Sequence, residues 1–242
     1  MKLITANWPA PDHISAFTTT RLGGCSKGVY DSFNLGDHVG DAPHLVSANR
    51  QLLSGQFKFL KQPQWLSQVH GTDLIKANSN GLVVEADACW SDETGQPCVV
   101  MTADCLPVFF TDKQGSRVAV AHAGWRGLLD GVLEQALSVF PDPSEVLVWF
   151  GPAIGPLAFE VGDEVKQQFC DRMQTSETAF SSSQNAGKWM ADIYQLARLR
   201  LNRAGVQNIS GGEYCTFSQS ELFYSYRRDG VTGRMASVIW IN

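Results

Sequence analysis

The sequence predicts a single α/β (α+β) sandwich in which mixed β-sheet layers are flanked by helices. The chain has 242 residues, of which 44% are apolar and 18% charged, so it can bury a substantial core. Segments with helical spacing alternate with short apolar runs, but without strict βαβ regularity, which favours a mixed sheet. No internal repeat and no Pro- or Ser-rich linker interrupts the chain, so we expect one domain over residues 1–242.

The first third of the chain predicts a strand, a long loop, a helix and a second strand. Residues 14–21, ISAFTTTR, are rich in β-branched and aromatic side chains and predict a strand. Residues 19–41 are dense in Gly, Asp, Asn and Ser, which is typical of a functional loop. An acid before Pro43 marks the start of a helix that we expect to end at Gly55. A short strand over residues 64–70 follows and ends at His-Gly.

The remaining elements follow from apolar runs and from helical periodicity. Strands are expected at residues 98–102, 106–111, 118–121, 146–150, 209–217 and 235–241. Amphipathic helices are expected at residues 128–140, 161–169 and 191–204. The helix over 191–204 should end at Gly205, since glycine commonly follows the last turn of a helix.

Composition and charge exclude several classes of function. The formal net charge is −5 and no run of Lys or Arg exceeds a pair, so no nucleic-acid surface is expected. The N-terminal MKLITANWPAPDH lacks the apolar region of a signal peptide, and no stretch approaches the ~20 apolar residues of a membrane span. We therefore expect a cytoplasmic protein whose six cysteines are thiols or ligands and not disulfides.

Three residues capable of ligating a metal lie where a predicted strand gives way to a turn. His70 lies in QVHG, Cys105 in ADCLP and His122 in AHAG. Side chains at strand ends are held by a rigid sheet and yet face a cleft. A strand-end histidine is also often structural, and a buried cysteine often acts as a small apolar residue. The sequence separations do not specify a metal site as paired Cys-X-X-Cys motifs would, so convergence of the three is a hypothesis.

If the three residues converge, two chemistries fit. A Cys/His2 site with an open fourth position is typical of a zinc ion that polarises a substrate or activates water. A Cys–His pair with a thiolate nucleophile is the alternative. The chain has five histidines and no His-X-His pair, so it cannot build the four-copper centre of a multicopper oxidase.

Two further segments are candidates for anion binding. In AHAGWRG, Gly124 lets the backbone approach a ligand, the amides that open the next helix point outward, and Arg126 can add a charged fork. The alternative interpretation of this segment is a plain tight turn in which Trp125 packs on the core. Asn49 and Arg50 lie on the buried side of the helix after Pro43, where polar groups need partners or a ligand; a salt bridge is the alternative role for Arg50.

The C-terminal segment FYSYRRDGVTGRMAS gathers Arg227, Arg228 and Arg234 with aromatic residues. A solvated turn explains this cluster, and we favour that interpretation.

The motifs TTRLGGCSKGVYDSFNLGDHVGD, QVHG, TADCLPV, AHAGWRG, GPAIGP and FYSYRRDGVTGRMAS, in this order, resemble the YfiH-type proteins, long labelled laccase-domain or polyphenol oxidase proteins. The resemblance covers nearly the whole chain and implies a single α/β sandwich. It further implies a metal, usually zinc with copper as an alternative, held by the residues matching His70, Cys105 and His122. It also implicates Arg50 in the site.

The resemblance implies purine nucleoside chemistry, namely phosphorolysis of adenosine, inosine, guanosine and methylthioadenosine, with adenosine deamination as a further activity. The expected ligands are then a purine nucleoside and phosphate, with Arg126, Gly124 and Asn49 as candidate phosphate or substrate contacts, in a monomer or small homo-oligomer. Three alternatives stay open: a Cys–His amidohydrolase acting on a small amide such as a cell-wall precursor, a copper-binding polyphenol oxidase-like protein, and a metal- or partner-binding protein without catalysis.

Overall fold

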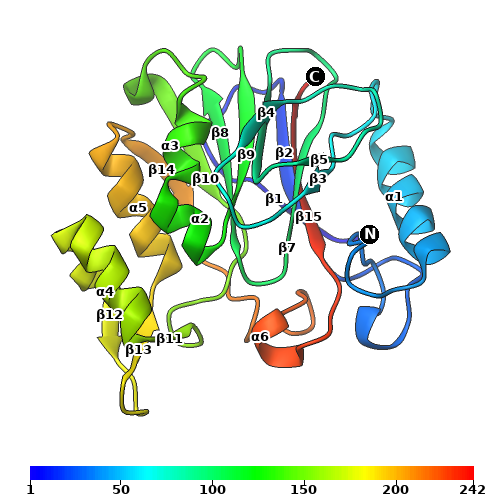
Figure 1. Ribbon diagram of the computed structural model, residues 1–242. Coiled ribbons are helices and arrows are strands. Elements are labelled where there is room, and N and C mark those ends of the chain that lie inside the picture. The colour runs from blue at the N-terminus through cyan, green and yellow to red at the C-terminus, as the bar shows by residue number, and fades with distance from the viewer.

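The computed structural model describes residues 1–242 as two β-sheets stacked face to face, with helices on both outer surfaces (Figure 1). The larger sheet has the strand order β14-β10-β8-β9-β6-β4 and the smaller one the order β1-β2-β15-β7. Within them, β10 pairs with β14 and β4 with β6 in parallel, whereas the other pairs are antiparallel. The predicted sandwich with mixed sheets is therefore confirmed.

The larger sheet consists of β4 (Leu74–Lys76), β6 (Ala88–Ser91), β8 (Leu106–Asp112), β9 (Val118–Ala123), β10 (Val146–Phe150) and β14 (Asn208–Gly211). The smaller sheet consists of β1 (Leu3–Thr5), β2 (Ile14–Thr19), β7 (Cys98–Thr102) and β15 (Met235–Ile241). Two minor sheets are formed by β3 (Leu66–Ser67) with β5 (Val84–Glu85), and by β11 (Glu160–Gly162), β12 (Phe180–Ser182) and β13 (Lys188–Ala191). The α-helices are α1 (Pro43–Phe57), α2 (Trp125–Asp130), α3 (Val132–Leu137), α4 (Asp163–Arg172), α5 (Ile193–Arg203) and α6 (Tyr226–Asp229). Short 3-10 turns are η1 (Gly28–Tyr30), η2 (Pro143–Glu145) and η3 (Gln174–Ala179).

The central strands are buried on both faces because successive side chains of a strand point to opposite sides. Along β15, Met235 and Ile239 join the core between the two sheets, while Val238 and Trp240 join a second core beneath α1. Each sheet therefore separates two apolar cores, and the layers follow the order helix, sheet, sheet, helices. Figure 1 shows α1 on the side of the sandwich opposite to α2, α3 and α5.

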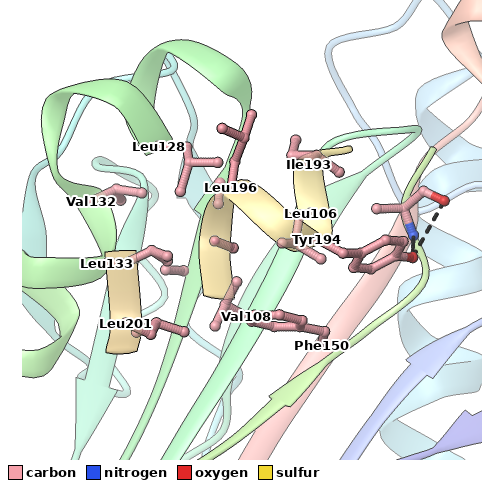
Figure 2. Packing of buried hydrophobic residues seen from close by; sticks show 14 of the residues in the cluster. Leu106, Val108, Leu128, Val132, Leu133, Phe150, Ile193, Tyr194, Leu196 and Leu201 are labelled. Carbon is pink, nitrogen blue, oxygen red and sulfur yellow. Dashed lines mark hydrogen bonds between the residues drawn. The ribbon is translucent and has the colours of Figure 1, made fainter. Parts of the chain in front are cut away.

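The outer face of the larger sheet carries the largest apolar core of the molecule, a cluster of 31 buried residues. Figure 2 shows Leu128 and Leu133 from α2 and α3, and Leu196 from α5, packed over Val108 of β8. Burying side chains of this size contributes about 1.5–3 kcal/mol each. This packing fixes the helices that follow β9, and with them the end of β9 that carries His122.

Three predicted strands have the observed bounds, at 98–102, 146–150 and 235–241. The helix predicted over 128–140 is wrong in its bounds, because the segment forms two helices separated by Gly131, whose φ is 112°. This left-handed conformation suits glycine and stops α2 before α3 begins. The predicted end of α1 at Gly55 is also wrong, since the helix continues to Phe57 and ends at Lys58 in a left-handed conformation.

Other boundaries shift because of contacts or backbone conformations that the periodic pattern does not report. The helix predicted from Val161 starts at Asp163, because Val161 and Gly162 pair with β13. The strand predicted to reach Phe217 ends at Gly211, which has a φ of 79°. The strand predicted over 64–70 is reduced to β3, since the backbone near His70 bonds to a side chain instead of to another strand.

The three predicted metal ligands, His70, Cys105 and His122, lie together at one end of the sandwich. Strands β7 and β9 end there, and β8 and β15 begin there, so Thr102, Cys105, His122 and Arg234 come from four neighbouring strand ends. In Figure 1 this is the lower end, where α6 lies. None of the helices combines the length and the apolar character that a bilayer crossing requires.

Candidate metal centre

His70, Cys105 and His122 meet at this end of the sandwich. One ligating atom of each side chain lies within 4.8 Å of the others, and the Cys105 Sγ is 3.8 Å from the His70 Nε2. The two imidazole rings are 4.7 Å apart between centroids, at an angle of 71°. His122 is buried, Cys105 is half-buried and His70 is exposed, so the group opens to solvent on one side. The convergence that sequence spacing left undecided is therefore present.

Asp87 is a buried carboxylate that positions both histidines. The His122 Nδ1–H donates to the Asp87 Oδ1 at 2.7 Å, which leaves the Nε2 of His122 free to ligate. The other contacts to this carboxylate come from the backbone, where the amides of Val69, His70 and Gly71 donate at 3.2, 3.0 and 2.6 Å. These bonds hold His70 at a φ of 62°, which non-glycine residues seldom adopt. A carboxylate behind a ligating histidine fixes the tautomer and orientation of its ring.

The electrostatics favour a thiolate at Cys105. Burial alone raises the pKa of a thiol, but the charge and hydrogen bond of His122, together with His70, lower the pKa of Cys105 to about 6. Burial alone likewise lowers the pKa of an imidazole, yet Cys105 and Asp87 raise the pKa of His122 to about 9. Burial also opposes the ionisation of Asp87, but its bonds to His122 and to the backbone amides keep its pKa below the ordinary value.

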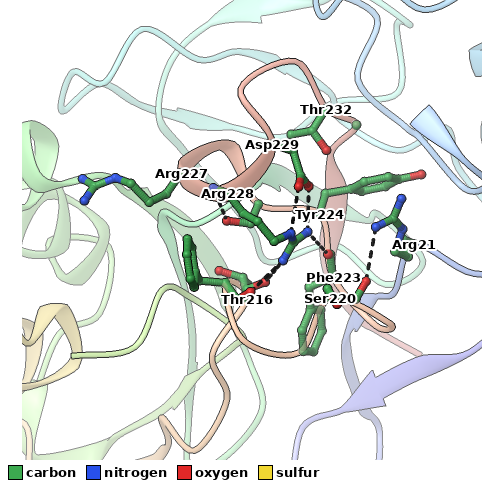
Figure 3. A network of polar contacts seen from close by, with 12 residues as sticks. Arg21, Thr216, Ser220, Phe223, Tyr224, Arg227, Arg228, Asp229 and Thr232 are labelled. Carbon is green, nitrogen blue, oxygen red and sulfur yellow. Dashed lines mark hydrogen bonds and ion pairs between the residues drawn. The ribbon is translucent and has the colours of Figure 1, made fainter. Parts of the chain in front are cut away.

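The turn that presents Cys105 is fixed by Asp104, which has a φ of 98°. Its carboxylate accepts hydrogen bonds from the Thr216 hydroxyl at 2.6 Å and from the Arg227 amide at 2.7 Å. These bonds tie the start of β8 to α6. The side chain of Arg228 holds α6 in turn, because it donates to the carbonyls of Thr216, Phe217 and Phe223 (Figure 3).

Gly124 allows the triad to close. A Cβ atom at this position would lie 2.7 Å from the His70 Cδ2 and 3.2 Å from the Cys105 Sγ. A side chain would therefore displace both residues. At Gly127 in α2, a Cβ atom would lie 2.7 Å from the carbonyl oxygen of Gly71. The absence of a side chain at Gly127 therefore leaves room for the backbone that follows His70.

Two cavities lie on either side of Cys105. The polar cavity has a volume of about 450 Å³ and is lined by His38, Gln68, His70, Met101, Thr102, Ala103, Cys105, His122, Tyr226 and Arg234. The apolar cavity has a volume of about 160 Å³ and is lined by Ala103, Asp104, Cys105, Trp125, Ile154, Phe159, Ile193, Tyr226 and Arg227. The open side of the triad therefore faces a space large enough for a small molecule.

Arg50 lies behind the polar cavity and not in its wall. Its guanidinium pairs with Asp37 at 3.2 Å, lies 4.0 Å from the ring centre of Trp65, and is 3.8 Å from the sulfur of Met101, which does line that cavity. Arg50 itself lines a separate cavity of about 600 Å³ between α1 and the loop that carries Trp65. The salt bridge considered for this residue is thus present.

Asn49 is buried, and its amide is engaged at both ends by the loop before α1. The Asn49 nitrogen donates to the Ser26 hydroxyl at 2.9 Å and to the Asn34 carbonyl at 2.8 Å, while its oxygen accepts from the Cys25 amide at 2.9 Å. These contacts hold the loop of residues 19–41 against α1. They leave Asn49 no direct path to either cavity.

Arg126 is exposed, and its guanidinium lies 4.2 Å from the centre of the Trp125 ring. Arg126 lines neither of the two cavities, whereas Trp125 lines the apolar one. Trp125 also packs against the core under α2. The packing role considered for Trp125 is therefore present, together with a position beside the site.

Sequence reasoning missed Asp87, Thr102, Gln68 and Tyr226 as parts of the site. No motif marks Asp87 in EADACW, and only the three-dimensional fold brings it to His122. The interpretation of the C-terminal arginines as one solvated turn was wrong. Arg228 is half-buried among backbone carbonyls, and Arg234 lines the polar cavity.

The donor set fits a metal ion of the catalytic zinc type. Such sites use three protein ligands from His, Cys and carboxylate and keep the fourth position open, whereas structural zinc sites are closed by four. Here two imidazoles and one thiolate meet, the buried histidine has a carboxylate partner, and the remaining side opens onto the polar cavity. Thiolate and imidazole ligands also suit copper.

Residues 15–242 match the family described as "Multi-copper polyphenol oxidoreductase laccase". A Haemophilus influenzae protein described as "Purine nucleoside phosphorylase" is 50% identical over 242 residues, covering 99% of each chain. The Escherichia coli (strain K12) "Purine nucleoside phosphorylase YfiH" is 50% identical, again over 99% of each chain. A crystal structure of a Neisseria meningitidis protein superposes with a TM-score of 0.96 at 46% identity, covering 100% of each chain.

The chain also resembles YlmD from Geobacillus stearothermophilus, whose crystal structure gives a TM-score of 0.88 at 33% identity over 96% of this chain and 93% of that one.

The family's description, "Multi-copper", names several copper ions. In this chain, His70, Cys105 and His122 form the one group of three or more His, Cys, Asp or Glu side chains placed to hold a metal. One such triad cannot build the multinuclear cluster that a laccase requires.

Proposed function

The chain belongs to the multi-copper polyphenol oxidoreductase laccase family of YfiH-type proteins, and on that premise we propose that it is a zinc-dependent purine nucleoside phosphorylase with adenosine deaminase activity. The names of relatives that are 50% identical over nearly their whole length support the first activity. The observation that carries the proposal is the triad of His70, Cys105 and His122, whose open side faces the polar cavity.

Phosphorolysis exchanges one bond for another at the sugar carbon C1′. An oxygen of orthophosphate forms a bond to C1′ while the bond from C1′ to the purine N9 breaks, which gives ribose 1-phosphate and the free base. The transition state resembles an oxocarbenium ion, and the departing base carries negative charge, so preorganised donors and cations speed the reaction. The polar cavity offers such groups, because Arg234 lines it and no Asp or Glu does.

His70, Cys105 and His122 would hold the zinc ion, which supplies a Lewis acid and lowers the pKa of water. Asp87 keeps a proton on the Nδ1 of His122 and fixes the direction of the ring. Asp104 and Gly124 keep Cys105 and His70 in place. The deaminase part of the proposal, in which water replaces the 6-amino group of adenosine and ammonia leaves, rests on the same open position.

Among the other predicted contacts, we propose that Arg50 and Asn49 act through the scaffold. Asn49 holds the loop of residues 19–41, and Arg50 supports Met101 in the cavity wall. Gly124 admits the metal ligands and need not touch the substrate. Arg126 stays a candidate for contact with ligand at the rim of the site, since its side chain is exposed beside Trp125.

The experiment that tests the proposal is an assay of zinc-loaded protein with inosine and orthophosphate. We expect hypoxanthine and ribose 1-phosphate in equal amounts, and no hypoxanthine without phosphate. In the same assay, adenosine should yield adenine and, by deamination, inosine. If the zinc-loaded protein leaves inosine and adenosine unchanged while phosphate is present, the proposed function is wrong.

One observation favours a second candidate function, a Cys–His amidohydrolase. Cys105, with a pKa of about 6, His122 and Asp87 form a thiolate–imidazole–carboxylate series. In this alternative the Cys105 sulfur bonds to the amide carbon and the amine leaves with a proton from His122; water then cleaves the thioester, which releases the acid and restores the thiolate. Alkylation of Cys105 would then abolish activity, and removal of metal would preserve it. Loss of activity on chelation, restored by zinc, argues against this candidate.

A further inference from the structure

The two cavities beside the triad share three wall residues, Ala103, Cys105 and Tyr226. The apolar cavity, at about 160 Å³, is smaller than the roughly 300–1,000 Å³ typical of sites for small molecules. It can therefore hold one part of a ligand and not a whole nucleoside. A molecule that fills both cavities must cross the boundary at Cys105.

The two cavities differ in chemistry. Seven of the nine residues around the apolar cavity are apolar or aromatic, and Trp125 and Phe159 are among them. Four of the ten residues around the polar cavity are apolar. A flat heteroaromatic ring gains from stacking and apolar burial, whereas a sugar or a phosphate group needs hydrogen-bond donors.

The polar cavity carries unused donors for an anion. Arg234 takes part in no salt bridge, and its one engaged nitrogen, Nη1, donates to the backbone carbonyls of Thr232 and Gly233. Its Nη2 and Nε have no partner in the protein. The hydroxyl of Thr102, which is only 1% exposed, also has no hydrogen-bond partner and belongs to the same wall. A buried hydroxyl without a partner costs free energy unless a ligand or a water satisfies it.

The nearby charges reinforce this arrangement. His38 lines the polar cavity with Arg234, and its carboxylate neighbour Asp37 is shared with Arg50 outside the wall. The acidic residue closest in the chain to Cys105, Asp104, lines the apolar cavity, where it is bonded to Thr216 and to the Arg227 amide. An anion in the polar cavity therefore meets a guanidinium and no carboxylate in the wall.

We propose that a purine nucleoside lies across both cavities, with its base in the apolar cavity against Trp125 and Phe159, and that orthophosphate binds in the polar cavity beside Arg234 and Thr102. This inference rests on the proposed function. It places C1′ at the boundary, next to Cys105, so that the bond to the base breaks toward one cavity while the bond to phosphate forms from the other. Arg234, and not Arg126, is then the main phosphate ligand.

Steady-state kinetics with each substrate varied in turn test the assignment. Arg234→Gln removes a charged donor and is expected to raise the KM for phosphate about tenfold to a hundredfold, with a small effect on the KM for inosine. Thr102→Val keeps the shape of the side chain and is expected to raise the KM for phosphate by up to about tenfold. Trp125→Leu is expected to raise the KM for inosine about tenfold, since it removes an aromatic ring on which the base can stack.

Matched variants control for general effects. Arg172→Gln removes an exposed arginine that pairs with Asp130, and Trp8→Leu removes a half-buried tryptophan far from the site; neither is expected to change either KM. If Trp125→Leu does not fold, Arg227→Ala is the second variant, since Arg227 lines the apolar cavity and not the polar one, and it should still raise the KM for inosine. The opposite pattern, with Arg234→Gln acting on inosine and Trp125→Leu acting on phosphate, or no effect of either variant, overturns the assignment.

Equilibrium binding separates this inference from the proposed function. Hypoxanthine alone should quench tryptophan fluorescence in the wild type, and Trp125→Leu should weaken its binding. Inorganic phosphate, measured by calorimetry, should bind the wild type and lose affinity in Arg234→Gln. If the wild type catalyses no phosphorolysis and yet these two losses occur, the proposed function fails and the assignment of the cavities stands. If the protein is active and neither ligand loses affinity, the assignment fails alone.

Discussion

At the scale of single residues, Asp87 links the two histidines of the site through one carboxylate. It accepts the Nδ1 proton of His122, and it also holds the backbone of residues 69–71 in the conformation that directs His70 toward Cys105. Because a carboxylate behind a ligand fixes both ring direction and tautomer, its loss affects metal binding more than the loss of an equally buried carboxylate elsewhere.

Asp87→Asn is therefore expected to lower the affinity for zinc about tenfold to a hundredfold. Competition with a chromophoric chelator measures this affinity. Asp112→Asn is the matched control, since Asp112 is a buried carboxylate that accepts from the Ser116 amide and hydroxyl, away from the triad. Both variants should lower the melting temperature, and only Asp87→Asn should weaken zinc binding. Equal zinc affinity in the two variants would show that Asp87 does not position the ligands.

Cys105 is expected to react as a thiolate in the metal-free protein. Its pKa is about 6, so the rate of alkylation by iodoacetamide should reach half of its maximum near pH 6 and stay high above it. Cys170 provides a control within the same sample, because burial raises its pKa, and its alkylation should increase only at higher pH. Peptide mass spectrometry distinguishes the two sites. A midpoint for Cys105 at pH 8 or above would contradict the assigned electrostatics.

Two glycines differ in their effect on the helices: Gly131 separates α2 from α3, whereas Gly55 lies within α1. Gly131 has a φ of 112°, and a Cβ there would contact other atoms no closer than 3.6 Å, so only backbone strain opposes alanine. Gly55 lies inside α1, where a Cβ would contact nothing within 4 Å. The same substitution should therefore have opposite effects at the two positions.

Gly131→Ala is expected to lower the free energy of unfolding by about 1–2 kcal/mol, the cost of a left-handed conformation with a side chain. Gly55→Ala is expected to raise it by about 0.5–1 kcal/mol, because alanine loses less conformational freedom in a helix. Urea denaturation of both variants measures these changes. A loss of stability in Gly55→Ala would contradict the description of α1 as a regular helix through this position.

The sequence predicted the buried strands well and the edge elements poorly, for a physical reason. Strands such as β7, β10 and β15 are buried on both faces and therefore read as continuous apolar runs. The short strands β4 and β5, at two or three residues, carry little pattern of their own. Their position depends on partners elsewhere in the chain, which local periodicity does not report.

The site could be predicted in part. His70, Cys105 and His122 stand out because each is a ligand type at a strand end, and the structure brings them together. Asp87 and Thr102 could not be found, since their roles depend on long-range contacts between strands that lie next to each other only in the fold. Arg234 was visible in the sequence as one of three clustered arginines, but nothing local distinguished it from Arg228, which supports α6.

At the scale of the whole molecule, we predict that residues 1–242 unfold as one cooperative unit. The core beneath α2, α3 and α5 includes Phe169 of α4 and Ala191 of β13, so the peripheral sheet shares the same apolar cluster as the sandwich. Urea transitions followed by tryptophan fluorescence and by circular dichroism should superimpose in the metal-free protein. Two separated transitions would show that the segment around α4 forms an independent domain.

We propose that one zinc ion, held by His70, Cys105 and His122, supports phosphorolysis. Titration of the metal-stripped protein with zinc, with the release of hypoxanthine from inosine and phosphate as the readout, tests this claim. Activity is expected to rise linearly to one equivalent of zinc and then remain constant, and His122→Ala is expected to stay inactive throughout. Full phosphorolysis in the stripped protein, or an unchanged response in His122→Ala, would contradict the claim.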